Sequence, residues 1–246
     1  MTKYSSILLS WIALFYMAAC MPVEEGHPLT LDQISYDQVN VSSIWQHGVE
    51  GHSDSLIPYL RGQNPVERFV ALQMFSNKRM EVPLLEVGKL LNDPVERIRN
   101  KAAFILGQSG ASEATPLLVS AFDRNDSLAR QDAFNSIVLE AVGKTGNAKQ
   151  AYQIAKVTTY TSRDSLLTLG QARALFQFGQ RGIITDESIA KMISFLSTPT
   201  YAQSVRYVAA VYLRRFNVGR LDSFEYTIQR TMRTAEDPLL MEQLAG

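Results

Sequence analysis

The chain has 246 residues, with 24 basic and 24 acidic side chains, so its formal net charge is zero. A protein that neutralises phosphates needs a surplus of Lys and Arg, and the balanced charge therefore argues against nucleic-acid binding. The only cysteine, Cys20, permits no disulfide within the chain. We therefore expect the stability of the fold to come from packing alone.

The first 20 residues have the composition of a secretory signal. Lys3 supplies a basic start, and an apolar run from Ile7 to Met17 follows. This run is shorter than the ~20 residues that a transmembrane helix needs. The segment Met17-Ala18-Ala19-Cys20 resembles a bacterial lipobox, in which the cysteine is acylated and becomes the new N-terminus. We predict a lipoprotein signal peptide over residues 1–20 with Cys20 as the lipid-attachment residue; an ordinary signal peptide is the alternative.

Residues 21–40 mix Pro, Gly, Asp and Ser without a helical period, and we predict that they form a flexible tether. Met21 supplies no acidic inner-membrane retention signal, which favours an outer-membrane lipoprotein on the periplasmic side. Glu24-Glu25 leaves export to the cell surface as an alternative. From residue 41 to residue 246 the pattern becomes helical.

Two similar segments, Asn64-Pro65-Val66-Glu67 and Asp93-Pro94-Val95-Glu96, are predicted to begin helices. An Asn or Asp side chain accepts hydrogen bonds from the first backbone N–H groups, and Pro at the first helical position loses no hydrogen bond. After the second start, apolar residues recur on one helical face. We expect this helix to end over Gly107–Gly110, and its partner to begin at Pro116.

One sequence motif recurs along the chain. Ile98-Arg99-x-x-Ala102-Ala103-x-x-Leu106 returns as Val205-Arg206-x-x-Ala209-Ala210-x-x-Leu213, and looser copies surround Arg68 and Arg130. Arg68, Arg99 and Arg130 are each 31 residues apart, and such a period is typical of a solenoid. Three later helices are expected over Arg163 to Gly179, Asp186 to Leu196 and Leu221 to Met232. Two more are expected to begin near Ser204 and at Asp237-Pro238. Since the pattern stops inside an apolar helix, we expect the array of residues 41–246 to continue in a longer protein.

The phrase from Asp93 to Gly107 resembles a HEAT repeat of the short type also found in phycobilin lyases. The resemblance implies an all-α solenoid of about five to six helical hairpins. It also implies an Asp–Arg ladder between neighbouring units, which would carry over to Asp93 and Arg99. Only the arginine matches at Arg68, Arg130 and Arg206. We therefore assign inter-repeat structural roles to Asp93 and the four arginines; a ladder of ligands for acidic peptide termini is the alternative.

A narrower likeness combines the lipobox, the segment Asp54–Leu60, the repeats and the segment Ala174–Ile183. Together they are similar to HEAT-repeat lipoproteins of the Bacteroidetes type. Members of that family often carry a cyclophilin-type peptidyl-prolyl isomerase domain after the repeats. Residues 1–246 contain no such domain, so the resemblance implies only what a longer parent protein would add.

Residues suited to catalysis or metal binding are few. The three histidines, His27, His47 and His52, precede the repeats, and His47 and His52 are five residues apart, which does not place them on one helical face. Gly143-Lys144-Thr145 has Val138 where a phosphate-binding loop needs glycine. We therefore predict no catalytic residue, metal site, cofactor or small-molecule substrate.

We expect the protein to be a membrane-anchored scaffold that binds another protein or peptide. The partner-binding candidates are four tyrosines of the later units: Tyr152, Tyr160, Tyr207 and Tyr212. Two alternatives come from other classes. The first is that the chain is the N-terminal targeting region of a periplasmic peptidyl-prolyl isomerase. The second is that it is a lyase-like enzyme that uses the groove of the array.

Overall fold

The computed structural model describes residues 39–76, 80–126, 130–157, 166–216 and 225–234, together with Pro238 and Leu240. All of them belong to one compact unit that begins at Tyr36. Within the described residues every regular element is helical and no strand occurs, so the fold is all-α, as predicted. The predicted signal peptide with Cys20, almost all of the predicted tether, and Tyr160 lie outside the described residues.

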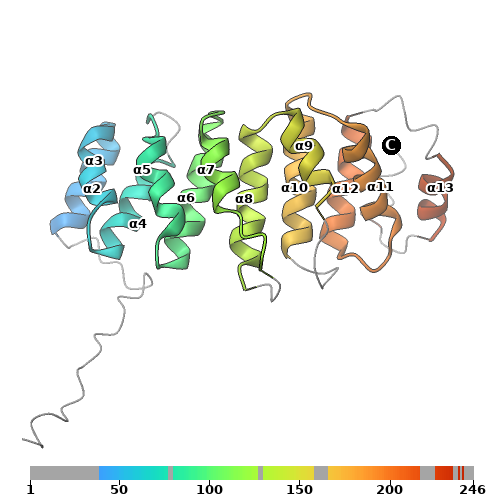
Figure 1. The fold of residues 1–246 in the computed structure, drawn as a ribbon, viewed down its shortest axis with the longest axis horizontal. Helices are drawn as coiled ribbons and strands as arrows, with labels where there is room; N and C mark the ends of the chain where they lie inside the picture. The colour runs from blue at the N-terminus through green and yellow to red at the C-terminus, as the bar shows by residue number, and fades with distance from the viewer. Residues whose placement is uncertain are drawn as a thin grey trace, which may run out of the picture. The chain divides into compact units, whose positions relative to one another are not determined.

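Twelve α-helices and one 3-10 helix make up the described part of the unit (Figure 1). In chain order they are α2 (Val39–Glu50), α3 (Ser53–Leu60), α4 (Pro65–Met74), α5 (Leu84–Lys89), η2 (Leu90–Asn92), α6 (Glu96–Ser109), α7 (Ala114–Ala121), α8 (Asp132–Thr145), α9 (Ala148–Ala155), α10 (Leu166–Gln180), α11 (Asp186–Ser197), α12 (Gln203–Arg215) and α13 (Glu225–Thr234).

The helices pack in two series, and Figure 1 shows them side by side in chain order. In the first series α2, α4, α6, α8, α10 and α12 each contact the next member. In the second series α3, α5 and α7 form one run, and α9, α11 and α13 form another. Contacts therefore join helices that are neighbours or next neighbours along the chain.

Local signals set the helix ends largely as predicted. Asn64 caps α4, because its side chain accepts from the Val66 N–H at 3.0 Å and Pro65 is the first helical residue. Helix α6 ends at Ser109, where Gly110 takes the left-handed conformation at φ +66°.

Two helix starts differ from the prediction. Asp93 does accept from the Val95 N–H at 2.9 Å, but α6 begins only at Glu96, after an extended Val95. Helix α7 begins at Ala114, so Pro116 lies inside its first turn, where a missing N–H breaks no intrahelical hydrogen bond.

The first-series helices approach closely at small residues. The repeated alanines are fully buried, including Ala102, Ala103, Ala209 and Ala210. At Gly143 on α8, an added Cβ would lie 2.5 Å from the backbone oxygen of Ala174 on α10. Such contacts leave no room for a side chain, so these positions fix how far apart neighbouring helices stand.

Candidate functional site

Arg68 on α4 and Asp93, just before α6, join two neighbouring hairpins. Arg68 Nε donates to Asp93 Oδ2 at 2.7 Å and Nη2 donates to Oδ1 at 3.2 Å. Only 11% of the arginine side chain and 3% of the aspartate side chain are exposed. Arg68 Nη1 also donates to the backbone oxygens of Gly62 and Gln63. This bidentate, largely buried arrangement is the strong form of an ion pair.

Arg99 does not pair with the Asp93 carboxylate, and that part of the expected ladder is wrong. Its Nη1 donates to the backbone oxygens of Asp93 and Pro94 at 2.8 and 3.1 Å, while its guanidinium lies 5.9 Å from the Phe134 ring centroid. The carboxylate instead meets Arg68, because α4 packs against α6 and brings the arginine of the preceding hairpin to it.

The other two arginines behave differently from each other. Arg206 Nε donates to the backbone oxygen of Leu196 at 3.2 Å, which links α12 to the end of α11. Arg130 is exposed and precedes α8, and its backbone N–H donates to Asp126. The inter-repeat role assigned to Arg130 stays a prediction.

Three of the four candidate tyrosines are described, and they lie in different environments. Tyr152 on α9 and Tyr207 on α12 are 40% and 39% exposed, as a contact residue requires. Tyr212 on α12 is fully buried, and burial raises the pKa of its phenol to about 12. Its ring packs edge-on against Phe216 at 5.1 Å between centroids. Tyr212 is therefore a core residue, and its assignment as a partner-binding residue is wrong.

A cleft of about 370 Å³ opens between α7 and α9, which are the facing ends of the two runs of the second series. Its floor is apolar and comes from α8, through Val138, Leu139 and Val142. Phe122 lines one wall, after the end of α7, and Ile154 of α9 lines the other. Clefts of this size with an apolar floor are the usual form of a binding site in proteins.

Two buried amide side chains fix the walls of this cleft. Asn135 of α8 accepts from the Asp123 N–H and donates to the Asp123 carbonyl, each at 3.0 Å. Gln171 of α10 donates to the carbonyls of Ile154 and Val157 at 2.6 and 2.8 Å. These bonds tie the backbone beside or within the lining to α8 and α10.

The rim of the cleft is basic and polar. Arg124 and Lys156 are the charged residues among those that line it, and Gln150 and Gln153 add amides. The Lys156 ammonium donates to the Tyr152 hydroxyl and lies 4.2 Å from that ring's centroid. The hydrogen bond raises the pKa of Lys156, so the group is charged near neutral pH. The exposed Tyr152 thus stands at the edge of the basic rim.

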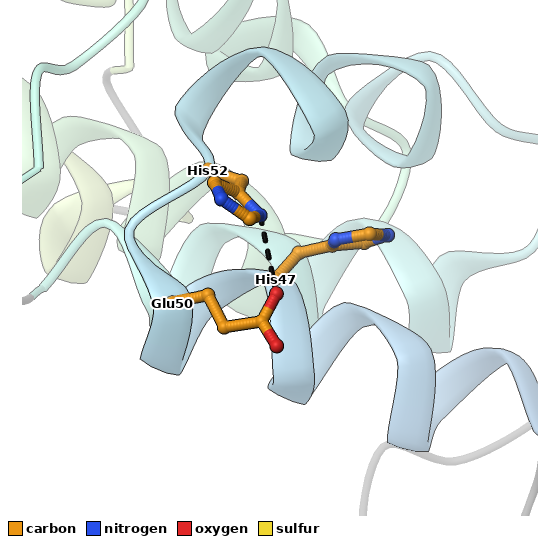
Figure 2. Close-up of side chains that lie close together, drawn as sticks. All are labelled: His47, Glu50 and His52. Atoms are coloured by element: carbon orange, nitrogen blue, oxygen red, sulfur yellow. Dashed lines mark ion pairs between the residues drawn. The ribbon is translucent and has the colours of Figure 1, made fainter.

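A second cluster lies at the turn between α2 and α3, where His47, Glu50 and His52 come together (Figure 2). Helix α2 ends in a Schellman motif: the His52 N–H bonds the His47 carbonyl at 2.9 Å, and the Gly51 N–H bonds the Gly48 carbonyl at 3.4 Å. Gly51 makes this possible, because its φ is +79°. The motif places the side chains on either side of the turn next to each other.

The side chains of this cluster already interact. His52 Nδ1 lies 3.2 Å from Glu50 Oε2, the pair joined by the dashed line in Figure 2. The His47 and His52 ring centroids are 6.2 Å apart. One potential ligand atom from each of the three residues lies within 4.8 Å of the others. Among the described residues these are the histidines and carboxylate best placed to hold a metal ion.

Sequence reasoning missed both features for identifiable reasons. It set His47 and His52 apart because five residues do not share a helical face, but Gly51 ends the helix between them. The segment Glu50-Gly51-His52 was the usable signal, since Gly commonly occupies the position after a helix C-cap. The cleft had no such signal, because it depends on how α7, α8 and α9 are placed.

No family model matches the chain, and no curated protein sequence is significantly similar to it. The described helices also include none with both the length and the hydrophobicity required to traverse a lipid bilayer.

Proposed function

We propose that the chain is a protein-binding scaffold and that the cleft over α8 is its docking site. The successive helical hairpins, in this proposal, form a solenoid of the HEAT type, in which each unit covers the apolar side of the next. Contacts confined to neighbouring and next-neighbouring helices support this arrangement. The observation that carries the proposal is the cleft with its apolar floor and basic rim.

The chemistry of the cleft selects a peptide that pairs an apolar side chain with a carboxylate. Val138, Leu139 and Val142 offer an apolar floor to the first group, and Arg124 and Lys156 attract the second. A second hollow, of about 750 Å³, shares Val119, Phe122 and Arg124 among its lining residues. The proposed docking surface therefore continues from the cleft past the end of α7, which suits an extended chain.

Peptide display on the purified protein tests this proposal. Selected peptides should combine a large apolar residue with a nearby Asp or Glu. Val119→Trp, which fills the cleft, should weaken their binding at least tenfold, and Lys156→Glu should weaken acidic peptides most. Ala148→Trp is the matched control, because Ala148 is exposed on α9 and does not line the cleft.

The docking site would be contradicted if the selected peptides bound Val119→Trp as tightly as they bind the unsubstituted protein. Prolyl isomerase turnover or a covalently held chromophore in the purified chain would contradict the scaffold and favour one of the enzyme alternatives.

The membrane anchor belongs to the same proposal. Acylation of Cys20 would hold the scaffold at the periplasmic side of an outer membrane, because a lipidated cysteine anchors a protein without spanning the bilayer. When a bacterium with two membranes that makes the protein is fed an alkyne fatty acid, the protein should become labelled. The labelled protein should be found in the membrane fraction. Cys20→Ser should abolish the label and release the protein. Membrane association without the label would contradict the anchor.

A further inference from the structure

We propose that His47, Glu50 and His52 form a binding site for a transition-metal dication of the Zn²⁺ class. The proposal goes beyond the scaffold function, since the cluster lies on the first hairpin and shares no residue with the cleft over α8. It rests on the type of donor atoms, on their separation and on the backbone that holds them.

The donor set suits zinc. Imidazole nitrogen and carboxylate oxygen are both common Zn²⁺ ligands, and sites with three protein ligands complete their tetrahedron with water. Oxygen-preferring ions such as Ca²⁺ and Mg²⁺ require more oxygen ligands than one carboxylate supplies. Two histidines with one glutamate therefore select an ion that accepts nitrogen ligands.

One ring nitrogen of His47 has an unused bonding capacity. Its Nδ1 atom is buried and has no hydrogen-bond partner among the described residues. A buried polar atom without a partner is costly. Asn100 Oδ1, Gln171 Oε1 and Tyr212 Oη share this state among the described residues, so the His47 nitrogen supports the site only together with the donor atoms beside it. A metal ion bound at this nitrogen would remove the deficit.

The separations are close to those of a metal site. Tetrahedral ligands at about 2.0–2.1 Å from Zn²⁺ lie roughly 3.4 Å from each other. His52 Nδ1 and Glu50 Oε2 are already 3.2 Å apart, and all three potential ligand atoms lie within 4.8 Å. Rotation of the His47 ring towards the pair in Figure 2 completes the set.

The backbone makes this arrangement reproducible. Glu50 follows His47 by three residues on α2, so the two side chains share a helical face. The His52 N–H to His47 carbonyl bond and the left-handed Gly51 hold His52 beside them. A bound ion would fasten the end of α2 to the start of α3.

The experiment is a titration of the purified, metal-free protein with Zn²⁺ in competition with a chromophoric chelator. We expect one ion per chain, and a loss of affinity of at least tenfold in His47→Gln and in His52→Gln. Glu50→Gln, which keeps the shape of the side chain, should weaken binding less. His27→Gln is the matched control, because His27 is the only other histidine of the chain and should not matter.

Substitution with Co²⁺ supplies a second readout that does not depend on affinity. The visible absorption of the Co²⁺ protein should have the high intensity of tetrahedral coordination. This absorption should disappear in His47→Gln. Circular dichroism of each variant checks that the helices persist. Three outcomes would overturn the site: no Zn²⁺ binding at all, binding that survives in His47→Gln, or an equal loss of binding in His27→Gln. Binding of peptides at the cleft should be the same in all of these variants, so this result and the scaffold test are separable.

Discussion

The junctions α4–α6 and α8–α10 connect equivalent helices of successive hairpins by different means. Between α4 and α6 a largely buried ion pair, Arg68–Asp93, makes the connection. Between α8 and α10 the backbones themselves meet, with Gly143 against Ala174. A long arginine side chain can follow a small shift of its helix, whereas a backbone contact cannot. The first junction is therefore specified by charge and the second by shape.

The largest effect is expected at the second junction. Gly143→Ala would place a Cβ 2.5 Å from the Ala174 carbonyl oxygen and 2.8 Å from its Cα. Because both atoms are backbone, the helices must separate, and we expect a loss of about 3 kcal/mol in the free energy of unfolding. Chemical denaturation measures it.

Gly88→Ala on α5 is the control for that substitution. The nearest atom to its added Cβ is the end of the Leu117 side chain, at 2.9 Å, which can rotate away. The better helix propensity of alanine, about 1 kcal/mol, should then offset most of the strain. Equal losses in the two variants would show that side-chain crowding, not backbone contact, limits these junctions.

A smaller effect is expected from the charged junction. Asp93→Ala leaves Arg68 without its carboxylate in a mostly buried position, and should cost about 2–3 kcal/mol. Arg99→Ala removes bonds to two carbonyls but leaves the Arg68–Asp93 pair intact, so we expect only about 1 kcal/mol. Both follow from denaturation curves. A loss in Arg99→Ala as large as that in Asp93→Ala would mean that the ion pair with Arg68 does not dominate.

The smallest effect concerns an exposed ion pair between α3 and α5. Arg61, the C-cap of α3, donates to both oxygens of Glu86 at 2.8 and 2.9 Å, and Lys89 Nζ donates to both at 3.0 and 3.1 Å. The hydrogen bonds from Arg61, first, and from Lys89 lower the pKa of Glu86 from 4.5 to about 2. The unfolded chain therefore binds this proton more readily than the folded one.

The sign of the pH dependence follows. The stability that the ionised Glu86 contributes is complete above its unfolded pKa of 4.5 and is lost as the pH falls towards about 2. Thermal melting of the original protein and of Glu86→Gln, compared between pH 7 and pH 2, should show a difference that shrinks over this window. Because Arg61 is exposed, the difference should also shrink in salt. If the difference in melting between the two proteins were constant with pH, ionisation of Glu86 would not contribute to stability.

The candidate sites differ in how far they could be predicted. Tyr152 and Tyr207 were chosen as aromatic residues of the later units, and both prove to be exposed. Tyr212 was chosen on the same grounds, yet it is buried against Phe216, because the face that a helix turns inward depends on its neighbours. Neither the cluster of His47, Glu50 and His52 nor the cleft was predicted. The cluster requires a turn to be placed first, and the cleft requires three helices to be placed.

The sequence by itself determined the all-α fold, the capped start of α4, the end of α6 and the bounds of α11 to within a residue. These features depend on groups within one helical turn, such as the Asn64 side chain and the left-handed Gly110. Only the tertiary structure decided that Asp93 meets Arg68 rather than Arg99, and that an apolar cleft opens over α8. Those outcomes depend on the distance and rotation between whole helices, which packing sets and no short pattern contains.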